Sequence, residues 1–180
     1  MNLIQKKQFK QKIVPHLWFD DQAKEAASFY VDVFNKNPFK LKNENSEVGK
    51  ETYYVKSTEE VSGKPAGSIM TVDFIINGQN FLALNGGPDF KFNESISFMV
   101  NCKNQQEIDY FWEKLSEGGD PKSQICGWLK DKYGLSWQIV PESLEKIFNQ
   151  EDSEKQEKVM AVFLKMGKIT IADLEKATSD

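Results

Sequence analysis

The chain has 180 residues and a formal net charge of −4, and all 23 of its basic residues are lysine. A hydrophobic content of 39% and an aromatic content of 12% indicate a globular protein with one core or two small fused modules. The negative charge argues against a nucleic-acid partner, and without arginine the chain lacks the bidentate donor that clamps phosphate or carboxylate groups.

Membrane and redox signals are also absent from the sequence. No stretch approaches the roughly 20 apolar residues of a membrane span, and the basic N-terminal extension, residues 1–11, lacks the apolar core of a signal peptide. Cys102 and Cys126 fit no metal-binding spacing and are too few for a disulfide framework. We therefore expect a cytoplasmic protein with free thiols and no membrane partner.

The first predicted elements are a strand and an amphipathic helix. Residues 12–19 have the composition of a strand, and Asp20 or Asp21 is expected to cap a helix that runs to about Phe34. The polar segment 35–45 is expected to hold a short exposed strand.

The next stretch combines strands with one conspicuous loop. Residues 51–56 are predicted as a strand, and the segment 57–67 has loop composition, which makes it a candidate for a mobile cover over a site. Strands at 68–76 and 80–85 form the clearest hairpin, because Asn77-Gly78 is a strong two-residue turn signal.

The second half starts again with a strand and a helix. A strand at 95–101 precedes a helix from about Asn104, where Asn104 and Glu107 have the spacing of a capping box. Two further strands are predicted at 124–129 and 135–140.

An internal repeat relates the two halves. A shift of 82 residues lays segment 16–34 on 98–116, and a weaker shift of 56 lays Gly78 on Gly134 and Phe81 on Trp137. Under the first shift the helices align Glu25 on Glu107, Ala26 on Ile108, Phe29 on Phe111, Tyr30 on Trp112 and Val33 on Leu115.

The predicted architecture is α+β, with two βαβββ modules at residues 12–88 and 89–141. The modules are expected to pair into a cupped, eight-strand mixed sheet with outer helices, whose concave side is the natural ligand pocket. Residues 142–180 form a C-terminal helical tail, in which helices are predicted around Ile147, from Ser153 and from Thr170.

Five separated blocks resemble one known family. They are LWFDDQAKEAASFY, PAGSIMTVDFIINGQNFLALNGGPDFKFNESIS, YFWEKLSEGG, CGWLKDKYGLSWQIVP and KVMAVFLKMGKITIADLEKA. Together they resemble the PhnB-like branch of the glyoxalase/bleomycin-resistance/dioxygenase (vicinal oxygen chelate) superfamily, whose members often carry the label 3-demethylubiquinone 3-methyltransferase. The resemblance implies the paired βαβββ fold and a homodimer.

Enzymes of that superfamily hold a divalent metal at four positions, which fall here near Pro15 or His16, near Leu82, near Ser95 and at Gln138. Only His16 and Gln138 are plausible ligands, because a leucine has no donor atom and a serine hydroxyl replaces a carboxylate poorly. We therefore expect no metal and no other cofactor, with His16 and Gln138 as the only candidate ligands. Methyl transfer is also disfavoured, because Gly86-Gly87-Pro88 leads into a linker and not into a helix.

The favoured function is binding of an unidentified small molecule without a metal. The candidate ligand-binding residues are Trp18, Phe92 and Trp128 for aromatic surface, and Asn85 and Gln138 for hydrogen bonds. The alternative is a lyase, isomerase or dioxygenase-type enzyme that uses a divalent metal in the cup. A third possibility is a protein that acts through its dimer surface, and the sequence leaves catalysis open.

Overall fold

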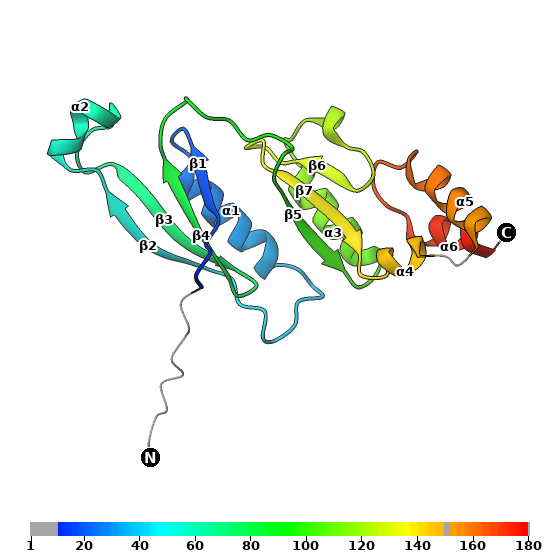
Figure 1. Ribbon diagram of the computed structural model, residues 1–180. Helices are drawn as coiled ribbons and strands as arrows, with labels where there is room; N and C mark the ends of the chain where they lie inside the picture. The colour runs from blue at the N-terminus through cyan, green and yellow to red at the C-terminus, as the bar shows by residue number, and fades with distance from the viewer. Residues whose placement is uncertain (1–10, 150–151, 180) are drawn as a thin grey trace, which may run out of the picture. The chain divides into compact units, whose positions relative to one another are not determined.

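The computed structural model describes residues 11–149 and 152–179, so most of the predicted N-terminal extension lies outside the described residues. The chain forms two compact units (Figure 1). The first contains the described part of Met1–Phe34 together with Lys42–Asp89. The second contains Asn35–Leu41 and the described part of Phe90–Asp180.

The first unit is a four-stranded sheet with one covering helix. The strand order is β1-β4-β3-β2, in which β1 is parallel to β4 and the other neighbours are antiparallel. Its elements are β1 (His16–Phe19), α1 (Ala23–Asn35), β2 (Glu47–Tyr53), η1 (Lys56–Thr58), α2 (Glu59–Ser62), β3 (Ile69–Ile76) and β4 (Gln79–Asn85).

Aromatic rings fill the space between α1 and the sheet. The Tyr30 ring lies 6.2 Å from the Phe74 ring, and Phe74 stacks on Phe81 at 5.1 Å, measured between centroids. The turn between β3 and β4 is the predicted Asn77-Gly78 turn, with φ angles of 46° and 82°. This hairpin is confirmed.

The second unit repeats the plan with a smaller sheet of order β5-β7-β6. Among the described residues this sheet has three strands. Before β6, Ile125 pairs with Trp128 only in an isolated bridge, so the first part of the predicted strand 124–129 does not form. Positive φ angles at Cys126 and Gly127 turn the chain there and end the pairing. The elements are β5 (Ser97–Cys102), α3 (Gln105–Ser116), η2 (Pro121–Ser123), β6 (Trp128–Lys130) and β7 (Ser136–Pro141).

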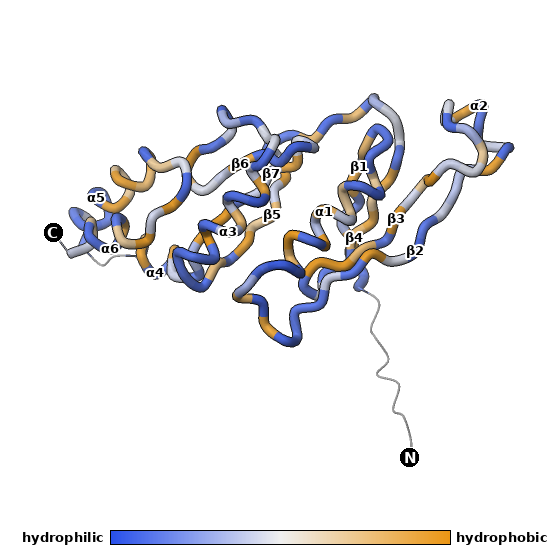
Figure 2. Tube along the Cα trace, turned by 180° about the vertical axis from the view of Figure 1, so that it is seen from behind, coloured by the Kyte–Doolittle hydropathy of each residue, from blue (hydrophilic) through white to orange (hydrophobic). Residues whose placement is uncertain are grey.

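The predicted tail is helical and belongs to the second unit. It comprises α4 (Leu144–Phe148), α5 (Ser153–Phe163) and α6 (Ile171–Ser179). Its apolar residues Ile147, Val159, Ile169 and Leu174 form a core cluster with Val140 of β7. Figure 2 shows the apolar residues that interrupt the polar surface of these helices and of α1 and α3.

The structural repeat has an offset of 81 residues, one less than the sequence match indicates. In α1 the buried residues include Ala27, Tyr30 and Phe34, and in α3 they include Ile108, Phe111 and Leu115. The strands agree with the same offset, because Leu17 and Phe19 face α1 as Phe98 and Val100 face α3. The run Tyr110-Phe111-Trp112 has three aromatic residues, so Phe29-Tyr30 can align with it at either offset in sequence, and burial selects the offset of 81.

Two local predictions in the first half are wrong. The segment 35–45 contains no strand, because Asn37 turns inward and its amide nitrogen donates to Glu107 Oε1 at 2.8 Å. The predicted loop 57–67 contains part of η1 and all of α2. Helix α1 is also capped differently from the prediction, since Ala23 N donates to Asn85 Oδ1 at 2.8 Å.

The broad prediction is confirmed: the protein is α+β, with two strand–helix modules followed by a helical tail. Within the part of the chain that the structure describes, none of the helices has the length and apolarity needed to cross a bilayer.

Candidate functional site

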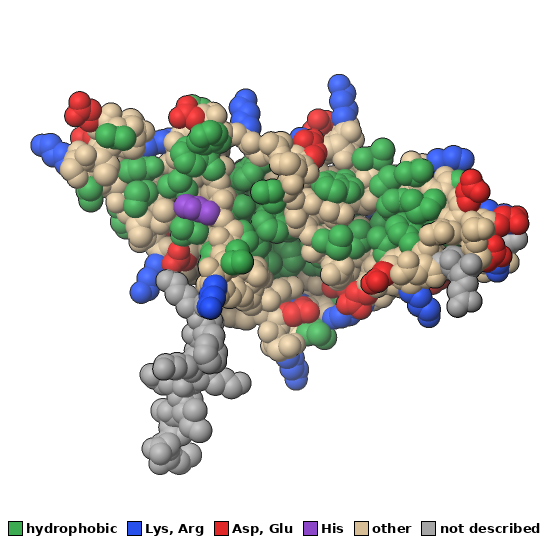
Figure 3. All heavy atoms as spheres, in the orientation of Figure 1, with side chains coloured by type: hydrophobic (Ala, Val, Ile, Leu, Met, Phe, Trp, Pro, Cys, Tyr) green, Lys and Arg blue, Asp and Glu red, His purple; other side chains and the backbone are tan. Residues whose placement is uncertain are grey.

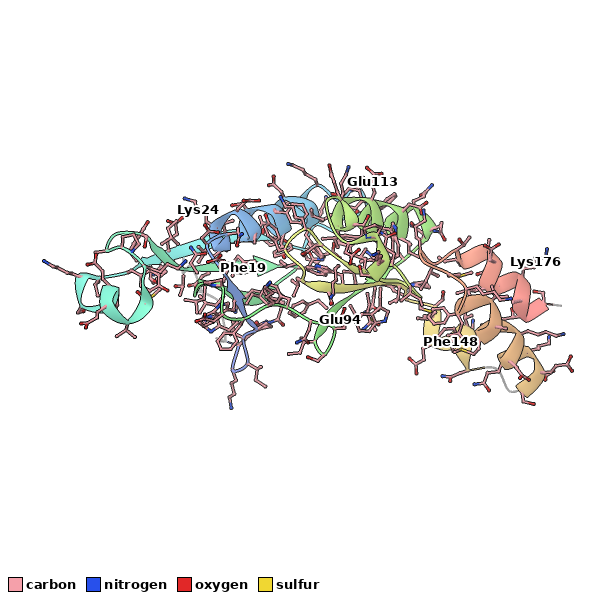
Figure 4. All side chains as sticks on the ribbon, turned by 90° about the horizontal axis from the view of Figure 1, so that it is seen from above. Phe19, Lys24, Glu94, Glu113, Phe148 and Lys176 are labelled. Atoms are coloured by element: carbon pink, nitrogen blue, oxygen red, sulfur yellow. The ribbon has the colours of Figure 1, made fainter. Side chains whose placement is uncertain are left out.

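The face of the second sheet opposite α3 carries the candidate site. Trp137, Ile139 and Leu129 are buried toward α3, so the alternating residues Ser136, Gln138 and Trp128 project from the other face. Figure 4 shows the two sides, with Glu113 of α3 on one side of the sheet and Glu94 on the other.

A cavity of about 420 Å³ opens on this face. It combines an aromatic and aliphatic wall with hydroxyl, thiol and charged groups. The lining residues are Glu94, Lys122, Ser123, Ile125, Cys126, Trp128, Leu129, Lys130 and Ser136.

The polar groups of the cavity differ in how they are satisfied. Lys130 forms an ion pair with Glu94, and this lysine holds the pKa of the Glu94 carboxyl below its usual value. Ser123 Oγ donates to Asp120 O at 2.6 Å and accepts from Lys130 N at 2.8 Å. Ser136 is 1% exposed, and its hydroxyl has no hydrogen-bond partner among the described residues.

Buried Asp131 shapes the turn that carries Lys130 and Ser136 into the site. Its Oδ1 accepts from the backbone N–H groups of Tyr133 and Leu135, at 2.9 and 3.0 Å. Its Oδ2 accepts from Trp137 Nε1 at 2.8 Å. A carboxylate with three donors is satisfied without a cation, so Asp131 acts here as a structural acceptor that fixes the β6–β7 connection.

The C-terminal tail supports the opposite wall of the cavity. Cys126 N donates to Met166 O at 2.7 Å, and Gly127 N donates to Gly167 O at 2.8 Å. The tail is anchored in turn to α3, where Gln105 Nε2 donates to Ile169 O and Gln105 Oε1 accepts from Ile171 N.

A second hollow of about 460 Å³ lies where β5 and β7 meet α4. Figure 3 shows hydrophobic side chains gathered on this part of the second unit. The lining residues are Met99, Asn101, Val140, Pro141, Glu142, Leu144, Glu145 and Phe148.

The predicted site residues of the second unit are only partly brought together. Trp128 lines the cavity and lies opposite Gln138 in the β6–β7 ladder. The Gln138 amide nitrogen donates to Ser97 Oγ at 2.8 Å. Ser97, and not Ser95, is therefore the β5 serine on the face of Gln138. Phe92 is half-buried in the segment before β5 and is not among the cavity residues.

The predicted site residues of the first unit take part in structural contacts. Trp18 Nε1 donates to Gly87 O at 2.8 Å, and Gly86 lies against the indole ring so closely that an added Cβ would be 2.3 Å from it. Asn85 is 8% exposed and joins the Ala23 amide to Ile69 O, to which its Nδ2 donates at 3.0 Å. Ligand contacts for Trp18 and Asn85 stay predictions.

The positions expected to hold a metal carry an unsuitable donor set. His16 is exposed on the open face of the first sheet, directly opposite Leu82. In the second unit Ser97 lies opposite Ser136 in the β5–β7 ladder, and its hydroxyl accepts a hydrogen bond from Gln138. The described residues contain no group of three or more His, Cys, Asp or Glu side chains placed to hold a metal ion. These residues do not fit a divalent ion.

Sequence reasoning missed Glu94, Lys130 and Ser136. Ser136 shares a strand face with Gln138, so alternation along β7 was a usable signal. The ion pair between Glu94 and Lys130 joins the interdomain linker to β6, and no local pattern announces such a contact.

The sequence profile described as 3-demethylubiquinone-9 3-methyltransferase matches residues 11–140. The PhnB protein from Bacillus cereus, provisionally described as the same methyltransferase, is 31% identical with a TM-score of 0.56. That alignment covers 73% of this chain and 99% of the Bacillus chain. No curated protein matches the sequence.

Of two more distant structures, the first shares the fold and the second aligns with a lower score. Protein PA1353 from Pseudomonas aeruginosa is 20% identical with a TM-score of 0.51, and the alignment covers 74% of this chain and 98% of that one. The fosfomycin resistance protein FosX from Listeria monocytogenes is 16% identical with a TM-score of 0.48, over 79% of this chain and 99% of FosX. From the profile match and the Bacillus structure, this chain belongs to the 3-demethylubiquinone-9 3-methyltransferase (PhnB-like) family.

Proposed function

We propose that this protein binds a small organic molecule, without a metal ion, in the cavity beneath Lys130 and Ser136. The observation that carries the proposal is the cavity itself. Its volume of about 420 Å³ lies within the roughly 300–1,000 Å³ of small-molecule sites. A half-buried tryptophan wall and a buried, unpartnered hydroxyl give it both apolar area and a group that a ligand can satisfy.

The name of the family describes methyl transfer, which we do not extend to this chain. A nucleotide-type cofactor usually meets backbone amides at a glycine-rich strand-to-helix turn. In this protein Gly86 and Gly87 lie against Trp18, one through close packing and the other through its carbonyl oxygen. These glycines serve the packing of a side chain of their own unit.

A screen on metal-free protein tests the proposal. The full chain is treated with a chelator, and its melting temperature is measured with flat, largely apolar small molecules, followed by calorimetry of any hits. We expect saturable binding that Trp128→Ala weakens. Trp112→Ala, which truncates a half-buried tryptophan on α3, is the matched control and leaves binding unchanged.

Metal analysis of the purified protein tests the proposal against the alternative of a metal-dependent lyase, isomerase or dioxygenase. Hits that appear only after a divalent ion is added would overturn the proposal. So would a stoichiometric ion in the purified protein that is lost in His16→Ala.

We also propose that the protein is a cytoplasmic homodimer. Family membership supports the dimer, and free thiols at Cys102 and Cys126 fit a reducing compartment. Sedimentation equilibrium tests the dimer, and a monomer at micromolar concentration would contradict it.

A further inference from the structure

The buried hydroxyl of Ser136 is the first clue to the class of ligand. A buried polar group without a partner costs about 1–3 kcal/mol. Ser136 lies at the cavity wall and pairs with Lys130 across the β6–β7 ladder. A bound molecule with a hydrogen-bond acceptor at this point would accept from the Ser136 hydroxyl and lie beside Lys130.

The charges around the cavity favour an anion. Its lining holds Lys122, Lys130 and Glu94, a formal sum of +1. Lys122 has no carboxylate partner among the residues that the structure describes, and Lys130 is paired only with Glu94. If Glu94 swings away, both ammonium groups become available to one ligand.

Glu94 is suited to such an exchange. Its side chain is 62% exposed, while that of Lys130 is 23% exposed. Glu94 lies in a turn just before β5 and belongs to no helix or strand. Exposed ion pairs contribute little net stability, so an incoming anion can replace this carboxylate at small cost.

The remaining wall is apolar and partly flat. Trp128 and Ile125 line the cavity, and Ile125 is 57% exposed at its edge. Such a wall favours an aromatic or similarly flat body, since stacking on an indole buries much area.

We propose that this cavity takes a small organic anion with a flat apolar body, whose anionic group displaces Glu94 from Lys130 and accepts a hydrogen bond from Ser136. This inference rests on the proposed function and specifies its ligand class. The acid group can be a carboxylate, sulfonate or phosphate, since each accepts a charge-assisted hydrogen bond from lysine.

Two fluorescent probes of nearly equal shape test the charge requirement. 1-Anilinonaphthalene-8-sulfonate is an anion, and N-phenyl-1-naphthylamine is its neutral counterpart. Both are titrated into the chelator-treated full chain at low ionic strength. We expect the sulfonate to bind about tenfold more tightly, because one charge-assisted contact contributes that much.

Three variants locate the effect. Glu94→Gln removes the competing carboxylate and should tighten sulfonate binding about threefold or more, with the neutral probe unchanged. Lys130→Met should weaken sulfonate binding about tenfold, again with the neutral probe unchanged. Glu113→Gln is the matched control, because it also removes a carboxylate paired with a lysine, but from the opposite side of the sheet (Figure 4).

The outcomes separate this inference from the proposed function. Equal affinity for both probes, or indifference of the sulfonate to Glu94→Gln and Lys130→Met, overturns the anion inference and leaves a neutral binding site. Failure of both probes to bind overturns the binding function as well.

Discussion

The two sheets share one plan and differ in what happens on the face away from the helix. In the first sheet, Trp18 packs against Gly86 and donates a hydrogen bond to Gly87 O. The hydroxyls of Thr52 and Thr71 form a hydrogen bond of 2.6 Å. In the second sheet, the Ser136 hydroxyl beside the cavity finds no hydrogen-bond partner within residues 11–149 and 152–179. The same strand and helix order therefore yields one satisfied face and one hollow face, and side chains decide which face can hold a ligand.

The largest expected effect tests the equivalence of the two helices. Tyr30→Ala and Phe111→Ala should each lower the free energy of unfolding by about 3–5 kcal/mol, because both rings are at most 2% exposed in their cores. Phe29→Ala and Trp112→Ala, at half-buried neighbours, should cost less. Urea denaturation followed by circular dichroism measures all four. The reverse ranking in either helix would restore the offset of 82 residues.

One added methyl group at Gly86 should displace the Trp18 ring from the open face of the first sheet. Gly86→Ala would place a Cβ 2.3 Å from the Trp18 ring, so the ring must move and lose its bond to Gly87. We expect a loss of about 1–3 kcal/mol in unfolding free energy and a red shift of tryptophan emission. Gly167→Ala is the control, since its nearest contact is 3.4 Å away. Equal effects from the two variants would contradict the close packing.

The second unit has an anchor that the first lacks, between α3 and the tail. Gln105→Ala removes two hydrogen bonds to the backbone of Ile169 and Ile171, so we expect a loss of roughly 1–2 kcal/mol. Hydrogen exchange should quicken across 159–174. Gln156→Ala, an exposed position on α5, should leave exchange unchanged. Unchanged protection in Gln105→Ala would show that the apolar cluster alone holds the tail.

On the second sheet, the Ser136 hydroxyl that we assign to ligand binding should lower the stability of the fold. Ser136→Ala removes the unsatisfied hydroxyl and should raise the free energy of unfolding by about 1 kcal/mol. Ser123→Ala removes two hydrogen bonds and should lower the free energy of unfolding by about 1 kcal/mol. Thermal denaturation of both variants makes the comparison. A destabilised Ser136→Ala would mean that the hydroxyl is already satisfied in solution.

The smallest effect concerns the two thiols of the second unit. Burial, followed by the charges of Glu107 and Glu142, raises the pKa of Cys102 to about 12, and burial also raises the pKa of Cys126. Only thiolates react with disulfide reagents, so at pH 8 Cys126 should react slowly and Cys102 only after unfolding. Single-thiol variants Cys102→Ser and Cys126→Ser assign the phases. Rapid labelling of Cys102 in the folded protein would contradict its burial.

Local signals predicted the elements that local contacts hold. Asn104 caps α3 through Glu107 N, three residues away, and the Asn77-Gly78 turn joins adjacent strands. The cap of α1 comes instead from Asn85, whose position beside Ala23 depends on the finished sheet. No pattern near residue 23 contains that information.

The candidate site divides in the same way. Alternation along β7 puts Ser136 and Gln138 on one face, because strand geometry fixes side-chain direction, whereas Trp128 joins them through the pairing of β6 with β7. The ion pair of Glu94 with Lys130 depends on how the linker meets the sheet. The unsatisfied hydroxyl of Ser136 depends on how the β6–β7 turn meets it. Such contacts follow from packing and cannot be inferred from spacing.

The backbone bonds from Cys126 and Gly127 to the tail have a consequence for shortened forms of this chain. The family profile ends at residue 140, yet the acceptors of those two bonds are Met166 and Gly167. A protein cut back to its recognisable core would leave two main-chain donors unmatched in a wall of the cavity. The C-terminal tail is therefore a structural part of the cavity wall, although the family profile does not include it.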